Sequence, residues 1–586
     1  MFSLFRFDYS TAGERAHNPV GHREFCKKNQ NWFSPEEYAF MTTKNNVVFL
    51  GFFLFGLFIF YPALSSYFFT DDFVFLAISR YVHNPLTFFN SDHFPGGVYY
   101  RPLGILSWWL SYKLFGTQHV LHNFVNIMIH IGNSYVLFRI FGLIRANLKL
   151  NILLALLFLV HPLTISTSMW LSDRFDLLAT LFVLFTIYSF LRYRLESIRA
   201  AYYSALVACV LASLSKELAY FTPLLVTIIA WYVHPNAIQT WRIKLSEIAP
   251  FYGAVLLVFA ARFMVLRGTK LFLGGNSLFT VLKGGVLHWL HLLPNFYTFH
   301  AEFAHRNVAV GILLLAAILI LAGLSLWALF MRRDVNWSAT ALALGLTLIL
   351  VPAILQAPVT FSSLAYHSSG GFDVDNLIGS RFYYLSFVGF LLVAQPLLTG
   401  ACSLFINPIS NLIAPRLVYV LLILQIIAYG ALSHSLGHRW SNLTNGQARN
   451  VVEHVSLALE PLSLPQNGCK LYILNTPSDS LYFREYSDAI IKAIAPEQSR
   501  IIHCLILTER MPWVEFVLRE DMKQIAPLRD AVAPMLVDGL AFMYLNRPNS
   551  AEIVLDPNAM FIEYDGEKYV DVSLQVKSGS KRVNFF

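Results

Sequence analysis

Long apolar runs recur along this chain and constrain its fold more than any other feature. A helix needs about 20 mostly apolar residues to cross the hydrocarbon core of a bilayer. Hydrophobic residues make up 56% of the 586 positions and charged residues only 13%, whereas soluble globular proteins carry about 25% charged residues. The sequence therefore predicts a polytopic α-helical membrane protein with about eleven transmembrane helices. The predicted spans are 46–66, 122–144, 150–170, 175–192, 201–217, 219–233, 248–266, 308–331, 338–357, 382–400 and 416–434.

The positive charges predict how the chain is oriented. Lys and Arg total 43 against 35 Asp and Glu, and much of the excess lies in short segments between apolar runs, where positive charge tends to stay cytoplasmic. This bias places the N-terminal segment inside and the loops 67–121, 267–307 and 358–381 outside. An odd number of spans puts the two ends on opposite sides. Because topology accounts for the basic charge, we expect no nucleic-acid partner.

The composition changes after residue 435 and divides the chain into three parts. We expect a cytoplasmic segment 1–45, a transmembrane domain 46–434 with a long first extracytoplasmic loop 67–121, and a soluble extracytoplasmic domain 435–586.

The last part of the chain has the pattern of a small α/β domain. The runs KLYILNT and RIIHCLILT are typical of strands, SDAIIKAIA of a helix, and Asp565-Gly566 of a hairpin turn. No repeat of fixed period appears in it. Cys469 and Cys504 both fall here, and the sequence leaves open whether they form a disulfide.

Two adjacent carboxylates, Asp71 and Asp72, follow the first apolar run directly, in YFFTDDFVF. A charged residue at the centre of a span costs about 2.5–3.5 kcal/mol on insertion scales, so charges near membrane depth are functional candidates. The alternative is an ordinary solvated start of a loop. The same loop continues through an aromatic-rich stretch with Trp108, Trp109 and Tyr112, which suits a helix lying in the membrane interface.

Four cations stand at span edges on the same predicted side of the membrane, and they could bind an anionic group. Arginine presents its donors in a planar fork that suits phosphate oxygens. The alternatives are a snorkelling anchor for the arginine in YYRPL and structural ion pairs for the cations that have acidic neighbours. The four residues are Arg101, Arg174, Lys216 and Arg381.

Histidines gather in HWLHLLPNFYTFHAEFAH, at His288, His291, His300 and His305. Their spacing fits no standard metal site, so interfacial histidines are the favoured interpretation and no residue is assigned as a metal ligand. His161-Pro162 is expected to shape the end of a helix. No glycine-rich phosphate loop appears in the sequence, which argues against a cytoplasmic ATP-driven engine.

Taken in order, these segments resemble a known family. The acidic pair, YRPL with an aromatic helix ending in LFG, HNFVNIMIHIGN, HPLTISTSMWLSDRFDLLAT, SLSKE and RFYYLSFVGF are similar to the membrane half of the transmembrane O-mannosyltransferases that carry tetratricopeptide repeats, and to their bacterial relatives. More distantly the chain resembles protein O-mannosyltransferases and lipid A aminoarabinose transferases, which are all class C (GT-C) glycosyltransferases. The resemblance covers about residues 46–400 and stops before the C-terminal domain.

The resemblance implies transfer of a sugar from a polyprenyl phosphate on the extracytoplasmic face. In that reaction Asp71 would be the general base and Asp72 its partner. Arg101, Lys216 and Arg381 would surround the lipid phosphate. The chemistry agrees with these residue types, because a base must take the acceptor's proton while fixed cations stabilise the leaving phosphate.

Two other functions stay open: an oligosaccharyltransferase that moves a whole glycan, and a flippase or transporter of lipid-linked sugars. The sequence does not identify the sugar, the acceptor (glycan, lipid or protein) or the use of a divalent metal. It shows neither repeats nor an organelle-targeting segment. We therefore expect a bacterial inner (plasma) membrane, in contact with membrane lipid, with the C-terminal domain in the periplasm.

Overall fold

The computed structural model describes most of the membrane domain and parts of the C-terminal domain. The described residues are 35–91, 99–144, 147–233, 241–266, 279, 283, 337–366, 380–404, 408–459, 470–475, 490–491, 493–494, 505–508, 513–518, 535–537, 540–545 and 559–578.

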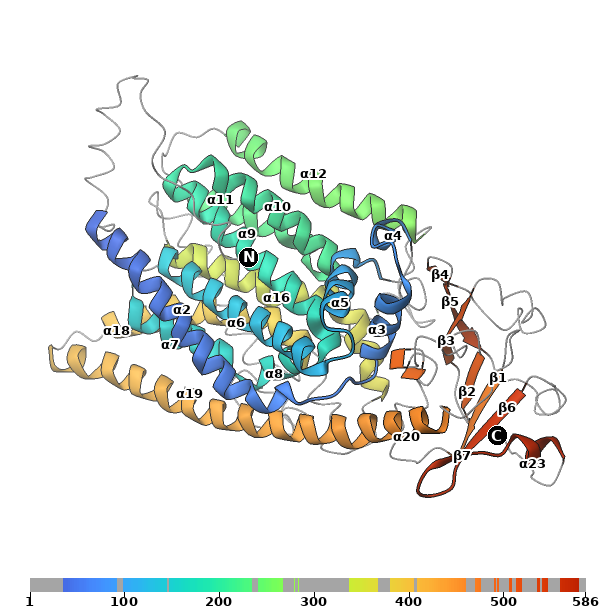
Figure 1. Ribbon diagram of the computed structural model, residues 1–586. Helices are drawn as coiled ribbons and strands as arrows, with labels where there is room; N and C mark the ends of the chain where they lie inside the picture. Colours follow the sequence, from blue (N-terminus) through green and yellow to red (C-terminus); the bar gives the residue numbers. More distant parts are fainter. Residues whose placement is uncertain are drawn as a thin grey trace. The chain divides into compact units, whose positions relative to one another are not determined.

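Helices form nearly all of the described chain up to residue 459 (Figure 1). In chain order they are α2 (Pro35–Leu64), α3 (Asp72–Tyr81), α4 (Thr87–Asn90), α5 (Pro102–Phe115), α6 (His119–Ile144), α7 (Leu148–Val160), α8 (Pro162–Met169), α9 (Arg174–Glu196), α10 (Arg199–Ser215), α11 (Thr222–Tyr232), α12 (Trp241–Val265), α16 (Trp337–Tyr366), α18 (Tyr384–Leu404), α19 (Pro408–Thr444) and α20 (Asn450–Leu459). Short 3₁₀ turns precede α9, α11 and α18, at Leu171–Asp173, Glu217–Phe221 and Ser380–Tyr383.

Within the described residues, seven helices are long and apolar enough to cross a membrane, which confirms the polytopic helical fold. The segments are Asn46–Leu64, His119–Ile144, Leu171–Glu196, Leu245–Val265, Ala339–Gln356, Arg381–Leu398 and Arg416–Thr444. Each coincides with a predicted span. The predicted span 308–331 lies outside the described residues.

The predicted span 150–170 is broken in the structure. Its two halves, α7 and α8, meet at an angle of 57° between Val160 and Pro162. Proline lacks the backbone donor that would continue the helix, and its ring clashes with the preceding turn. His161 caps the second half, because its Nδ1 accepts a hydrogen bond of 3.2 Å from the Leu163 amide. The expectation that His161-Pro162 shapes a helix end is confirmed.

Two further predicted spans, 201–217 and 219–233, are shorter in the structure than a full crossing. Helix α10 ends at Ser215, and the chain then passes through extended Lys216 before the turn Glu217–Phe221 and α11 begin. The two helices therefore meet at a non-helical residue, and that residue is one of the predicted phosphate ligands.

Helix α9 packs against α6 and α10, and α16 packs against α18. The second pair is held close by glycines. A Cβ added to Gly345 would lie 2.5 Å from the Gly389 carbonyl oxygen, and one added to Gly389 would lie 2.4 Å from the Gly345 carbonyl oxygen. Small residues of this kind let membrane helices approach at backbone distance, and here they fix the helix that follows Arg381.

The described part of the C-terminal domain contains two sheets. A four-stranded sheet has the order β2-β1-β6-β7, with β1 parallel to β2 and β6 and with β7 antiparallel to β6. A three-stranded antiparallel sheet has the order β3-β5-β4. The strands are β1 (Lys470–Leu474), β2 (Leu505–Thr508), β3 (Trp513–Leu518), β4 (Met535–Val537), β5 (Leu540–Leu545), β6 (Ala559–Tyr564) and β7 (Tyr569–Asp571), and the short helix α23 (Ser573–Lys577) follows them.

The α/β character predicted for the C-terminal domain is confirmed. KLYILNT supplies β1 and RIIHCLILT supplies β2, while the described residues of SDAIIKAIA are helical. Asp565-Gly566 opens the turn between β6 and β7; Gly566 has φ +111°, and the Asp565 carboxylate accepts from the Lys568 amide at 2.9 Å. Cys469 and Cys504, whose pairing the sequence leaves open, lie outside the described residues, as do the four clustered histidines from His288 to His305.

Candidate active site

The acidic pair lies at a strained turn between the first span and α3. Thr70, directly before the pair, has φ +46°, which is uncommon for a β-branched residue and needs support from its surroundings. The support comes from Asp72. Its carboxylate accepts hydrogen bonds from the Phe69 amide at 2.8 Å and from the Ser172 hydroxyl at 2.5 Å. Asp72 is therefore a fixed member of the turn, with 1% of its surface exposed.

Burial raises the pKa of Asp72 from 3.8 to about 7. Loss of hydration is the main cause. The hydrogen bonds from Ser172 and Phe69 act in the opposite direction, and the negative charge of Asp71 adds to the rise. Asp72 therefore changes protonation near neutral pH.

This shift predicts how stability depends on pH. The folded-state pKa is raised, so folding favours the protonated form. That contribution is complete below about pH 4 and is lost as the pH rises through about 7. Between these values we expect the melting temperature of the wild type to fall a few degrees further than that of Asp72→Asn. Thermal unfolding of both proteins across this range checks the difference, and parallel profiles would contradict the buried carboxyl.

Asp71 differs from its neighbour in both burial and contacts. It is half-buried and precedes α3 without a side-chain capping bond. Its carboxylate makes no hydrogen bond or ion pair with any residue that the structure describes. Of the two carboxylates, Asp71 is thus the more exposed.

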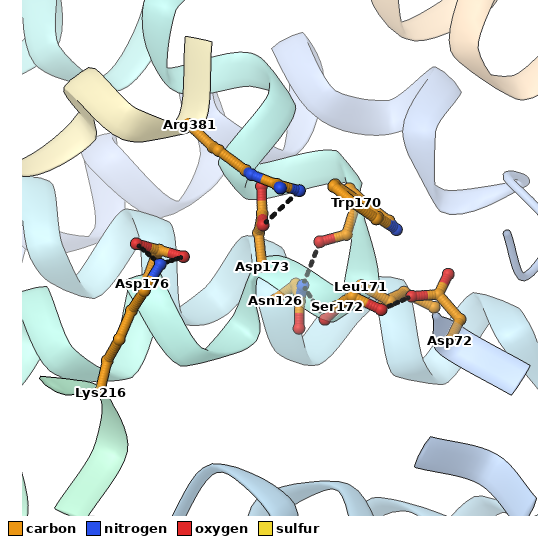
Figure 2. A network of polar contacts seen from close by, with 9 residues as sticks. All are labelled: Asp72, Asn126, Trp170, Leu171, Ser172, Asp173, Asp176, Lys216 and Arg381. Atoms are coloured by element: carbon orange, nitrogen blue, oxygen red, sulfur yellow. Dashed lines mark hydrogen bonds and ion pairs between the residues drawn. The ribbon is translucent and has the colours of Figure 1, made fainter. Parts of the chain in front are cut away.

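The 3₁₀ turn Leu171–Asp173 connects the acidic pair to Arg381, one of the predicted cations (Figure 2). Ser172 donates to Asp72, and the next residue, Asp173, forms an ion pair with Arg381, with 3.6 Å between Oδ1 and Nη1. The Arg381 guanidinium also lies 4.5 Å from the centre of the Trp170 ring. Its side chain is 23% exposed, and it makes no hydrogen bond to a described residue.

The other two predicted phosphate ligands are also paired with carboxylates. Lys216 donates to both oxygens of Asp176, at 2.6 and 2.5 Å. Arg101 bonds through Nε to Glu217 at 2.9 Å, and the same carboxylate accepts from the Tyr100 amide at 3.0 Å. The side chains of Lys216 and Arg101 are 12% and 14% exposed. Adjacent residues Lys216 and Glu217 thereby join the two pairs.

These groups form one electrostatic cluster. Asp173 interacts with Arg381, Asp176, Lys216 and Asp72, and Lys216 interacts in turn with Arg101. All six predicted site residues are thereby linked, because Asp71 adjoins Asp72 in the chain and Arg174 interacts with Asp72.

Arg174, the sixth, is placed differently, because it is fully buried. Its guanidinium donates to Asn126 Oδ1 at 2.7 Å, to the Ser111 hydroxyl at 2.9 Å and to the His122 carbonyl at 3.2 Å. It also lies 4.7 Å from the centre of the Trp108 ring. In the described structure Arg174 joins α5 and α6 to α9 and does not reach an exposed surface.

Sequence reasoning missed three residues of this network. Ser172 bonds Asp72, Trp170 stacks on Arg381, and Asn126 donates to the Trp170 and Leu171 carbonyls at 3.3 and 3.4 Å. Ser172 and Trp170 stand in the quoted motif MWLSDRFDLL, so their position next to Asp173 was the available signal. For Asn126 the signal was the spacing of polar residues along HNFVNIMIHIGN.

No cluster of three or more His, Cys, Asp or Glu side chains among the described residues could hold a metal ion. A metal ligand set therefore cannot be assigned from these residues.

The comparisons with known proteins give structural matches only. No family model and no curated protein matches the sequence. Among solved structures, the chain is similar to ArnT from Cupriavidus metallidurans bound to undecaprenyl phosphate, with 12% identity and a TM-score of 0.42 over 85% of this chain and 98% of that one. It is also similar to the Archaeoglobus fulgidus oligosaccharyltransferase tethered with an acceptor peptide, with 11% identity and a TM-score of 0.43 over 78% and 64%. Both are GT-C glycosyltransferases, the class that the sequence motifs resemble.

Proposed function

We propose that this chain is an integral membrane glycosyltransferase that moves a single hexosyl or pentosyl unit from a polyprenyl-phosphate donor to an acceptor hydroxyl. The observation that carries the proposal is one polar network that joins the acidic pair to Arg381 through Ser172 and Asp173. At one end the Asp71 carboxylate makes no hydrogen bond or ion pair with a described residue, beside the anchored Asp72. At the other end Arg381 lies on the Trp170 ring and makes no hydrogen bond with a described residue. A base and a phosphate-binding cation are what this reaction needs.

The proposed reaction is an inverting displacement. The acceptor oxygen attacks the anomeric carbon while its proton passes to the Asp71 carboxylate. The bond between the anomeric carbon and the phosphate oxygen breaks, and the electron pair leaves with the lipid phosphate. Arg381, Lys216 and Arg101 stabilise the negative charge that grows on that oxygen.

Burial assigns the remaining residues to support of the site in this proposal. Asp72 holds the turn that presents Asp71, and its contact with Ser172 connects that turn to α9. Arg174 stabilises the helices behind the site, because all of its surface is buried. Asp173, Asp176 and Glu217 hold the three cations in place through ion pairs. The lipid phosphate would share the cations with these carboxylates.

Transfer by the purified chain in detergent tests the proposal. We expect a labelled sugar to move from a polyprenyl-phosphate donor to an envelope acceptor without a membrane gradient, in assays run both with and without a chelator. Comparison of glycans from deletion and wild-type cells by mass spectrometry would supply the acceptor. If lipid-linked sugar crosses vesicles that contain the chain but no glycosidic bond forms, a transporter replaces the enzyme. If only a preassembled glycan is transferred, the chain is an oligosaccharyltransferase.

We also propose that residues 435–586 lie outside the cytoplasm, in the periplasm of a bacterial inner membrane. The basic segments between the predicted spans motivate this orientation. A phosphatase fused after residue 586 is expected to be active, and a reporter that works only in the cytoplasm is expected to be silent at the same point. The reverse result would invert the orientation.

A further inference from the structure

Helix α6 carries polar side chains along a face that is fully buried. Asn126, His130 and Asn133 are spaced i, i+4 and i+7, so they lie on the same side of the helix. Each has 0% of its surface exposed. Burying such groups is costly unless they are hydrogen-bonded, so their partners indicate what the residues do. We call these three residues the α6 polar stripe.

The first member of the stripe holds the turn before α9. Asn126 donates through Nδ2 to the carbonyl oxygens of Trp170 and Leu171, as Figure 2 shows. The two residues that follow are Ser172, which bonds Asp72, and Asp173, which pairs with Arg381. On its other side Asn126 accepts from Arg174 Nε at 2.7 Å. One amide thereby fixes the segment that joins the acidic pair to the cation.

The other two members hold the start of α18. His130 Nε2 lies 3.0 Å from the Leu159 carbonyl oxygen, which can only accept, so we assign the ring proton to Nε2. Nδ1 then accepts from the Tyr384 hydroxyl at 2.7 Å, and that hydroxyl accepts from Asn133 Nδ2 at 3.0 Å. Asn133 Nδ2 also reaches the Leu177 carbonyl at 3.1 Å.

Tyr384 is the first residue of α18 and directly follows the turn Ser380–Tyr383 that contains Arg381. The stripe therefore supports both partners of the ion pair between Asp173 and Arg381. It bonds the backbone just before Asp173 and the side chain of Tyr384, which lies three residues after Arg381. These two partners come from segments about 200 residues apart in the sequence, so a shared support is needed to fix their separation.

We propose that the α6 polar stripe is a positioning element of the active site, which sets the distance between the acidic pair on one side and the phosphate-binding Arg381 on the other. Asn126 controls the acidic side through the Trp170–Ser172 segment. His130 and Asn133 control the cationic side through Tyr384. The inference rests on the proposed function, and it adds Asn126, His130, Asn133 and Tyr384 to the residues on which the reaction depends.

Two single substitutions separate the two ends of the stripe. Tyr384→Phe removes only the hydroxyl that His130 and Asn133 hold, so the turn that carries Arg381 loses these two hydrogen bonds while the aromatic ring stays. Asn126→Asp keeps an oxygen acceptor for Arg174 and removes both amide donors to the Trp170 and Leu171 carbonyls. Tyr202→Phe is the control. The Tyr202 hydroxyl donates a partly buried hydrogen bond of 2.9 Å to the Glu247 carbonyl, at the opposite end of α10 from Lys216.

Steady-state kinetics with a polyprenyl-phosphate sugar measure the effects. For Tyr384→Phe we expect KM for the donor to rise about 10-fold with kcat changed less than about 3-fold, because the two hydrogen bonds that hold Tyr384 beside the Arg381 turn are lost. For Asn126→Asp we expect kcat to fall about 10-fold or more with a smaller change in donor KM. Tyr202→Phe should keep both constants within about 2-fold of the wild type.

The result that overturns the proposal is loss of melting temperature in Tyr384→Phe and Asn126→Asp without this division between KM and kcat, as a purely structural stripe would give. The proposal is also overturned if both variants have the same kcat and donor KM as the wild type. If the wild type transfers no sugar at all, the proposed function fails by itself. The stripe is then judged by binding of polyprenyl phosphate, which Tyr384→Phe should weaken about 10-fold and Tyr202→Phe should leave unchanged; equal affinities overturn the stripe too.

Discussion

Asp71→Asn is expected to lower the turnover of sugar transfer by about 10²- to 10⁴-fold, which is the usual contribution of a general base. The substitution keeps the size of the side chain and removes its ability to take a proton. Asp71 makes no hydrogen bond or ion pair with a described residue, so folding and membrane insertion should be unaffected. Transfer of a single labelled sugar by purified protein, at saturating donor and acceptor, gives the measurement.

Two comparisons make the Asp71 result specific. Asp72→Asn should also impair the enzyme, but partly through a raised apparent KM, because the Asp72 carboxylate holds the turn through Phe69 and Ser172. Glu453→Gln removes an exposed acid that is paired with Arg449 and should leave turnover unchanged. If Asp72→Asn is inactive while Asp71→Asn turns over normally, the two roles are exchanged. If both variants turn over normally, the acidic pair is not catalytic.

The spans of this fold follow from local sequence, because a bilayer-crossing helix needs only an uninterrupted apolar run. Segments such as 122–144 and 338–357 could therefore be located without knowledge of their neighbours. The lengths of α10 and α11 could not be predicted from the local sequence in the same way. The run from 201 to 233 is apolar almost throughout, and at the interruption Lys216 pairs with Asp176, a residue 40 positions away that the local sequence does not reveal.

The candidate site was predictable as a set of residues but not as an arrangement. Asp173 and Arg174 are adjacent in sequence, and the sequence allowed them to form an ion pair with each other. In three dimensions, however, Asp173 ends the 3₁₀ turn and faces Arg381, whereas Arg174 begins α9 and faces α5 and α6. Successive helical residues point about 100° apart, and which direction meets the interior is set by neighbouring helices rather than by the local sequence.

The same reasoning explains why the pairing of the cations stayed open. Lys216 has Glu217 as its sequence neighbour, yet it bonds Asp176, and Glu217 bonds Arg101 instead. Extended backbone at Lys216 turns neighbouring side chains to opposite sides. Each of the two cations therefore pairs with a carboxylate from another segment. Arg101 and Glu217 are more than 100 residues apart in the sequence.

Arg381→Lys is expected to lower kcat/KM for the donor by about 10- to 100-fold, with most of the loss in KM. The Arg381 guanidinium lies against the Trp170 ring at 4.5 Å and forms a loose ion pair of 3.6 Å with Asp173. A flat cation stacked in this way can present parallel donors to two phosphate oxygens. A lysine ammonium keeps the charge but loses both the stacking and the fork. Arg381→Gln removes the charge too and should lower kcat as well, by about 10²-fold or more.

Donor and acceptor kinetics together decide whether Arg381 acts on the phosphate. We expect KM for the acceptor to stay the same in Arg381→Lys, because the acceptor is activated at Asp71, at the other end of the network. Arg192→Lys is the control: Arg192 pairs with Glu196 one turn along α9, and its side chain is 30% exposed, so the exchange should change kcat/KM by less than about 2-fold. An unchanged donor KM in Arg381→Lys would mean that the phosphate is held elsewhere and that Arg381 serves only to pair with Asp173.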